Sequence, residues 1–195
     1  MSDGKKLNRR DAVKALMSAC PEALVVAGLG SSAYDLFAAG DRDLNFYLWG
    51  AMGGAASIGL GLALAQPNRS VVVLTGDGEQ LMGLGSLATI GAAQPNNLTI
   101  VVLDNGHYGE TGMQKSHTSL GTDLTAVAAA CGLTWTMDVC ELSKLPSLAE
   151  RINTKQACGL ARISVSADEL PRALPNRDAV YLKNRFRAAL GLPVT

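Results

Sequence analysis

Two apolar runs near the middle of the chain constrain its fold more than any other feature. Residues 70–76 (SVVVLTG) run into a Gly-Asp-Gly turn, and residues 97–105 (NLTIVVLDN) end on Asp-Asn. Short continuous runs rich in β-branched residues are typical of strands buried on both faces of a parallel sheet. Residues 80–93, between the two runs, predict helix with glycine breaks. The order of strand, helix and strand predicts a βαβ unit.

The same alternation extends through the chain and predicts a three-layer α/β/α fold with a mostly parallel sheet. Further strands are expected at residues 23–27, 44–49, 133–139 and 159–165. Further helices are expected at residues 8–20, 33–40, 53–65, 123–132, 145–153 and about 178–190. A chain of 195 residues fits one domain, so we expect residues 1–195 to form a single domain.

Composition excludes several classes of protein. The formal net charge is zero and aromatic residues make up 5%, which does not suit a nucleic-acid or membrane-surface partner. The four cysteines have no CxxC spacing, which argues against a zinc or iron–sulfur site. The basic N-terminus, MSDGKKLNRRDAV, lacks the long apolar run of a signal peptide. The expectation is a soluble, cytoplasmic protein.

The turn Gly76-Asp77-Gly78 predicts a bound cation. Glycines allow a phosphate to approach the backbone, but an Asp in the same turn would repel it unless a cation lay between them. Magnesium prefers oxygen ligands and shares them with phosphates and water. Asn105 ends the next strand 28 residues later, and neighbouring strand ends lie about 5 Å apart. Asp77, Asn105 and the backbone carbonyl of His107 can therefore reach one ion.

This combination resembles the motif of thiamine diphosphate-dependent enzymes, a Gly-Asp-Gly followed some 25–30 residues later by Asn. The resemblance covers roughly residues 22–165. It implies the diphosphate-binding half of that fold, with Asp77 and Asn105 as side-chain magnesium ligands and His107 as a main-chain ligand. The family usually has Asn before the ligand Asn, and this chain has Asp104 there.

The resemblance also implies the cofactor contacts. Met52, 25 positions before Asp77, matches the apolar residue that wedges the cofactor into its bent form. The carbonyl of Gly50 would accept a hydrogen bond from the aminopyrimidine, and the His107 side chain either faces the substrate or has no catalytic role. The residues expected to bind cofactor are Gly30, Ser31, Ser32, Gly50, Met52, Gly76, Gly78, Glu79, Asn105, His107, Tyr108 and Gly109. Of these, Met52, Gly50 and His107 are the catalytic candidates. The backbone amide of Glu79 is expected near phosphate, and its carboxylate is expected to cap the helix.

One element of the family is missing from this chain. Cofactor activation needs a Glu on a separate pyrimidine-binding domain of about equal size, for which 195 residues leave no room. None of six glutamates is suitably placed: Glu22, Glu79, Glu110, Glu141, Glu150 and Glu169. The expected partner is a pyrimidine-binding α subunit that supplies this Glu, in a hetero-oligomer such as a heterotetramer.

Residues 83–90 and 103–114 further resemble the small subunit of sulfopyruvate decarboxylases and the C-terminal half of phosphonopyruvate decarboxylases. The implied reaction is non-oxidative decarboxylation of a 2-oxo acid with an anionic tail. An acetolactate synthase-like carboligase, a 2-oxo acid oxidoreductase subunit and a non-catalytic regulatory subunit remain alternatives. A dinucleotide-binding module is a further alternative, because residues 28–33 fit a GxGxxA pattern, although the acid expected after the second strand is missing. Lys115 and His117 either bind the substrate tail or lie in a solvated loop.

Overall fold

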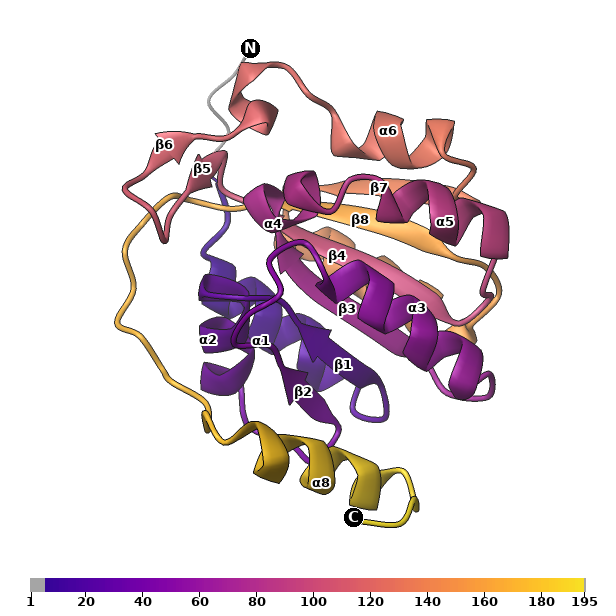
Figure 1. The fold of residues 1–195 in the computed structure, drawn as a ribbon. Helices are drawn as coiled ribbons and strands as arrows, with labels where there is room; N and C mark the ends of the chain where they lie inside the picture. The colour runs from indigo at the N-terminus through magenta and orange to yellow at the C-terminus, as the bar shows by residue number, and fades with distance from the viewer. Residues whose placement is uncertain (1–5, 195) are drawn as a thin grey trace.

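The computed structural model describes residues 6–194, so the first part of the basic N-terminal segment lies outside it. Its centre is a six-stranded sheet in the order β2-β1-β3-β4-β8-β7, in which neighbouring strands pair in parallel (Figure 1). The strands are β1 Leu24–Ala27, β2 Asn45–Tyr47, β3 Val71–Gly76, β4 Leu98–Asp104, β7 Trp135–Val139 and β8 Gly159–Ser164. Each was expected from the sequence, and the parallel sheet is confirmed.

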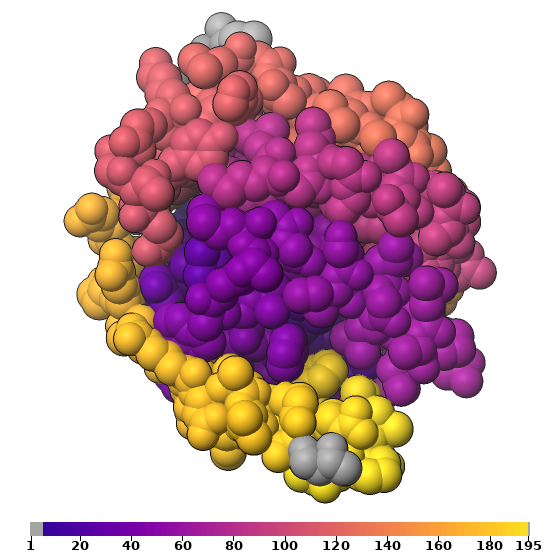
Figure 2. Space-filling view, in the orientation of Figure 1, coloured from indigo at the N-terminus to yellow at the C-terminus, as the bar shows by residue number. Residues whose placement is uncertain are grey.

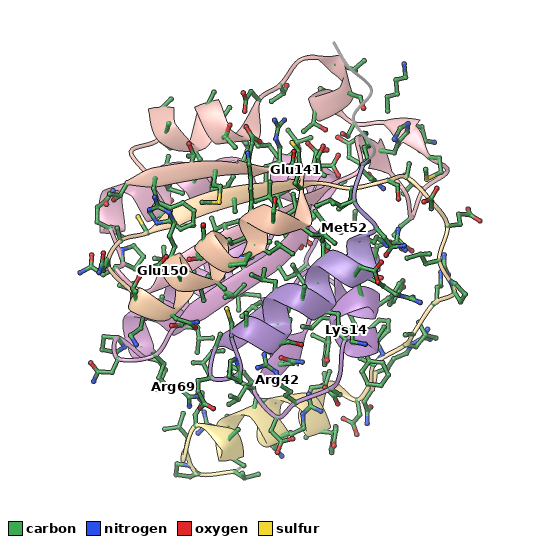
Figure 3. All side chains as sticks on the ribbon, turned by 180° about the vertical axis from the view of Figure 1, so that it is seen from behind. Lys14, Arg42, Met52, Arg69, Glu141 and Glu150 are labelled. Carbon is green, nitrogen blue, oxygen red and sulfur yellow. The ribbon has the colours of Figure 1, made fainter. Side chains whose placement is uncertain are left out.

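Helices cover both faces of the sheet. One face carries α1 Arg9–Ala19, α2 Ser31–Ala38 and α7 Leu145–Thr154, of which α1 and α7 cross the view from behind in Figure 3. The other face carries α3 Ala55–Ala65, α5 Ser86–Ala93 and α6 Leu124–Ala130 (Figure 1). Successive residues of β3 point to opposite faces, so Val72 packs in the core on the side of α1, α2 and α7, and Val73 packs under α3. This arrangement confirms the predicted three-layer α/β/α fold.

The C-terminal helix α8 Ala179–Ala189 covers the outer edge of the sheet beside β2 (Figure 1). Phe186 packs on Phe46 of β2 with ring centroids 5.5 Å apart, and the Arg185 guanidinium pairs with Asp41. The Asp178 side chain caps the helix by accepting hydrogen bonds from two backbone amides. An edge strand that would otherwise expose its unpaired backbone is thereby protected.

Strand order creates a crevice at one edge of the sheet. The chain passes from β1 outward to β2, then returns to β3 on the other side of β1. Connections that leave two adjacent parallel strands in opposite directions open a crevice beyond their carboxyl ends, where ligands bind in such folds. The turns after β1, β3 and β4 meet there.

Three local details differ from the sequence expectations. Residues 106–119, expected to be a loop, contain the hairpin β5 His107–Tyr108 and β6 Gln114–Lys115 and begin the short 3-10 helix η1 His117–Leu120. Helix α4 Asp77–Met82 begins directly after β3 rather than at residue 80, and α2 begins at Ser31 rather than at residue 33. Between residues 6 and 194, no helix has the length and apolar character needed to cross a membrane.

Candidate active site

A hollow of about 720 Å³, including solvent at its open mouth, lies beyond the carboxyl ends of β1, β3 and β4. Most of the predicted site residues line it: Ser31, Ser32, Met52, Gly76, Asp77, Gly78, Glu79, Asn105, His107, Tyr108 and Gly109. Gly30 and Gly50 do not line it, but each lies within two residues of one that does. Residues from four separate turns of the chain therefore come together in one hollow.

The Gly-Asp-Gly turn is covered by an aromatic ring. A Cβ atom added at Gly78 would lie 2.6 Å from Cδ1 of Tyr108, closer than such atoms can approach. The position can therefore hold only glycine unless Tyr108 moves. This contact fixes the start of β5 against the start of α4, so the turn after β3 and the turn after β4 form one surface.

Asp77 is a buried carboxylate at the floor of this surface, with 2% of its area exposed. Its Oδ2 atom accepts a hydrogen bond from the Ser116 hydroxyl, and the Thr118 hydroxyl oxygen lies 3.3 Å from it. Burial raises the pKa of Asp77, the hydroxyl of Ser116 lowers it, and the nearby charge of Asp104 raises it. Among residues 6–194, no Lys, Arg or His pairs with this carboxylate within 4 Å.

Asn105 and His107 form a tight turn at the end of β4. The side-chain oxygen of Asn105 accepts a hydrogen bond from the His107 amide at 2.8 Å, and Nδ1 of His107 lies 2.9 Å from the Asn105 carbonyl. Because a carbonyl only accepts, this contact places the ring proton on Nδ1 and leaves Nε2 as an acceptor. His107 is half-buried and lines the hollow.

Asp104 lies behind the hollow rather than in its lining. Its Oδ1 accepts hydrogen bonds from the Gly106 amide at 2.9 Å and the Thr118 hydroxyl at 2.8 Å. Its Oδ2 lies 3.7 Å from the guanidinium of Arg162 on β8. The departure from the usual Asn therefore adds a charge that is paired from behind.

The carboxylate of Glu79 does not have the helix-capping role expected from the sequence. It does not cap α4, whose first turn has no side-chain cap. Oε2 instead accepts hydrogen bonds from the Leu29 amide at 3.1 Å and the Thr75 hydroxyl at 2.9 Å. Burial raises the pKa of Glu79, and hydrogen bonds from Thr75 and from backbone amides lower it. The side chain ties the turn after β1 to the end of β3, on the inner wall of the hollow.

Met52 lies on the rim of the hollow with 49% of its surface exposed (labelled in Figure 3). Its turn contains two residues with positive φ, Ala51 at 59° and Gly53 at 83°. A non-glycine residue in this region is uncommon and costs energy that other interactions must offset. An apolar side chain held out of the core by such a turn suits contact with a ligand better than packing.

Sequence reasoning missed several residues of the site. Arg9 lines the hollow from the start of α1 and pairs with the buried Asp35 at 2.6 Å, which its place in an amphipathic helix does not reveal. Ser116 and Thr118 lie in a polar loop whose fold could not be predicted. Lys115 and His117, considered for substrate binding, do not line the hollow. The Tyr108 hydroxyl lies 3.2 Å from Nδ1 of His117.

Comparison with solved structures defines the class of fold. The thiamine diphosphate-dependent 4-hydroxybenzoylformate decarboxylase of Rhodococcus jostii superposes on 87% of this chain with a TM-score of 0.71 at 19% identity, over 34% of its own length. The fold is that of the thiamine diphosphate-dependent enzymes.

Sequence comparison defines the family. Residues 29–165 match the family "Thiamine pyrophosphate enzyme, C-terminal TPP binding domain". The chain belongs to this family, whose cofactor is thiamine pyrophosphate, also called thiamine diphosphate.

Two curated relatives are similar over much of this chain. Phosphonopyruvate decarboxylase of Streptomyces viridochromogenes is 42% identical over 189 residues, which is 93% of this chain and 46% of the relative. Sulfopyruvate decarboxylase subunit beta of Methanocaldococcus jannaschii is 48% identical over 110 residues, 56% of this chain and 58% of the relative. The chain spans about half the length of these relatives.

Proposed function

We propose that this chain is the diphosphate-binding subunit of a two-chain, thiamine diphosphate-dependent decarboxylase. The substrate would be a 2-oxo acid with an anionic tail, and the products an aldehyde and carbon dioxide. The observation that carries the proposal is the hollow in which Asp77 and Asn105 meet at the ends of adjacent strands. The similarity to a phosphonopyruvate decarboxylase and to a sulfopyruvate decarboxylase subunit supports this substrate class.

The residues present fit a magnesium ion. Asp77 is a buried carboxylate without a cationic partner among the described residues, and a metal would supply the missing charge. No group of three His, Cys, Asp or Glu side chains suited to a metal occurs within residues 6–194. The ion would therefore depend on Asp77, the Asn105 amide oxygen, the His107 carbonyl and the oxygens of diphosphate and water, as magnesium commonly does.

When bound, the cofactor supplies a carbon nucleophile for the keto carbon of the substrate. This chain's residues would hold and orient it. Met52 would pack against its bent form, and the Gly50 carbonyl would accept a hydrogen bond from its amine. The free Nε2 of His107, on the lining of the hollow, could accept or return a proton during the reaction.

Exposed apolar side chains support the proposal that this chain binds a partner subunit. Ile58 and Leu64 of α3 are 37% and 59% exposed, and Met52 and Met82 beside the hollow are about half exposed. Figure 2 shows α3 and the segment after β3, in purple and magenta, across the front of the molecule. The face continues to the rim of the hollow, where a pyrimidine-binding subunit would bring its Glu to the cofactor.

The test is to express the chain with the product of the adjoining gene and to assay sulfopyruvate, phosphonopyruvate and pyruvate. We expect carbon dioxide and aldehyde only with both chains and magnesium, and no magnesium-dependent cofactor binding by Asp77→Ala. Full activity of this chain alone would contradict the two-chain site. Reduction of an electron acceptor would indicate an oxidoreductase, and a carboligated product a synthase.

The partner face has its own test. Leu64→Glu should leave the melting temperature of the isolated chain unchanged, because the side chain is exposed, but should prevent co-purification of the second chain. A matched control is Leu142→Glu, since Leu142 is 47% exposed and lies outside α3. Equal co-purification of the second chain with both variants would exclude α3 from the interface.

A further inference from the structure

The loop between β4 and α6 closes on itself beside the proposed metal site. Its hairpin, β5 and β6, leads into η1, which returns the chain to the end of β4 (Figure 1). The Gly106 carbonyl accepts hydrogen bonds from the Ser116 amide at 2.8 Å and from the Ser119 hydroxyl at 2.7 Å. This closure brings Ser116 and Thr118 against the end of β3.

The two hydroxyls join the carboxylates of Asp77 and Asp104. Ser116 is fully buried and donates to Oδ2 of Asp77. Oγ1 of Thr118 lies 2.8 Å from Asp104, 2.9 Å from Ser116 and 3.3 Å from Asp77. A hydroxyl has one proton, so the shortest contact to a carboxylate assigns that of Thr118 to Asp104, while that of Ser116 goes to Asp77.

Charge is balanced on only one side of this network. Asp104 has Arg162 at 3.7 Å, and Arg162 in turn pairs with Asp138 at 2.6 Å. Among residues 6–194, the side-chain partners of the Asp77 carboxylate are both hydroxyls, and both contact the same oxygen, Oδ2. The other oxygen, Oδ1, is left for a cation in the hollow that Asp77 lines.

We propose that Ser116 and Thr118 are positioning residues for the magnesium–diphosphate site. Thr118 donates to Asp104 and contacts Ser116 at 2.9 Å, and Ser116, the donor to Oδ2, fixes the rotation of the Asp77 carboxylate. Because they share a closed loop with His107, they also fix the separation between that carboxylate and the His107 carbonyl. The inference deepens the proposed function and rests on it: the hydroxyls set the spacing of the ligands before the metal arrives.

The alternative is that the hydroxyls only hold the loop shut. Ser119 provides the comparison, because its hydroxyl also closes this loop but contacts the Gly106 carbonyl and not Asp77. If loop closure alone mattered, loss of any of the three hydroxyls would weaken metal binding alike. If ligand positioning matters, loss at Ser116 or Thr118 weakens metal binding much more than loss at Ser119.

The experiment is a magnesium titration at saturating thiamine diphosphate. Binding to the chain in complex with its co-expressed partner is measured by calorimetry. Thr118→Val and Ser116→Ala should weaken magnesium binding roughly 10-fold or more, as residues behind metal ligands commonly do. Thr118→Ser retains the hydroxyl and should stay within about 2-fold of the wild type, as should Ser119→Ala. Thr118→Val keeps the size of the side chain, so it remains informative if Ser116→Ala fails to fold.

Unchanged magnesium affinity in folded Thr118→Val, or an equal loss in Ser119→Ala, would overturn the positioning role. Failure of the unmodified complex to bind thiamine diphosphate with magnesium would instead refute the proposed function. The two failures are therefore seen in different proteins.

Discussion

Replacing Asp77 by Asn should stabilise the cofactor-free chain while abolishing its response to cofactor. Burial and the charge of Asp104 raise the pKa of Asp77 above its usual value of 3.8. A carboxyl whose folded-state pKa is raised stabilises the fold below its unfolded pKa, and that contribution is lost as the pH rises through the folded value. At a pH above the folded-state value, the ionised Asp77 therefore costs the empty protein stability.

Asparagine keeps the shape and removes the charge, and its amide can donate to the Ser116 hydroxyl. We expect a gain of about 1–2 kcal/mol for a buried charge with hydroxyl partners only. In a chain of this length this raises the melting temperature by roughly 2–8 °C. The wild type with magnesium and cofactor at about 100 times their Kd should gain about 2.7 kcal/mol, or roughly 5–11 °C. The variant should gain nothing from cofactor.

The assay is thermal unfolding of both proteins, with and without magnesium and thiamine diphosphate. Asp35→Asn is a matched control, because Asp35 is equally buried but pairs with Arg9 at 2.6 Å and Arg10 at 3.1 Å. Leaving those guanidinium groups without a carboxylate should cost about 3 kcal/mol. A lower melting temperature for empty Asp77→Asn, or a retained response to cofactor, would refute the reasoning.

Three further predictions test the packing, the alkaline limit and the wedge. Gly59→Ala should lower the free energy of unfolding by about 1–3 kcal/mol, because its Cβ would lie 2.1 Å from a methyl group of Val73. Gly61→Ala meets open space and should add up to about 1 kcal/mol of stability. Urea titrations compare the two variants, and the reverse order of stability would contradict the packing of α3. Burial raises the pKa of Cys20 from 9.0 to about 11. The stability that this shift contributes below pH 9 should therefore decline by about 2 kcal/mol towards pH 10.5. Unfolding measured at both pH values should show the decline in the wild type and not in Cys20→Ala. Met52→Ala should lower kcat at least about 10-fold but lower the free energy of unfolding by less than about 1 kcal/mol, because the residue is half exposed. Comparable losses of activity and of stability would indicate ordinary packing.

The parts of the fold that the sequence predicts well are those with a strong local cause. Most strands of the large sheet are apolar runs, and Asp123 begins α6 by accepting hydrogen bonds from the amides of residues 125 and 126. The Gly-Asp-Gly turn and Asn105 could be placed together because strand ends in a parallel sheet meet at one edge. The site was therefore predictable where it depends on strands.

The parts that could not be predicted depend on contacts between distant segments. Glu79 carries the local signature of a helix cap, but its carboxylate instead accepts a hydrogen bond from the part-buried Leu29 amide, 50 residues earlier. Nothing in the local sequence indicates that contact, because it exists only once β1 and β3 are neighbours.

Asp104 shows the same limit and explains why this chain departs from the usual Asn. An amide at this position would need no countercharge, but a carboxylate beside Asp77 requires one, and Arg162 of β8 lies at 3.7 Å to provide it. The charge of Asp104 remains close enough to raise the pKa of Asp77. A cation bound at the Asp77 carboxylate would therefore be stabilising. Thr118, between the two acids, then binds the paired one and leaves Asp77 for the metal. Asp104, Arg162 and Thr118 thus act as one unit, and a substitution at any of them should be read through its effect on Asp77.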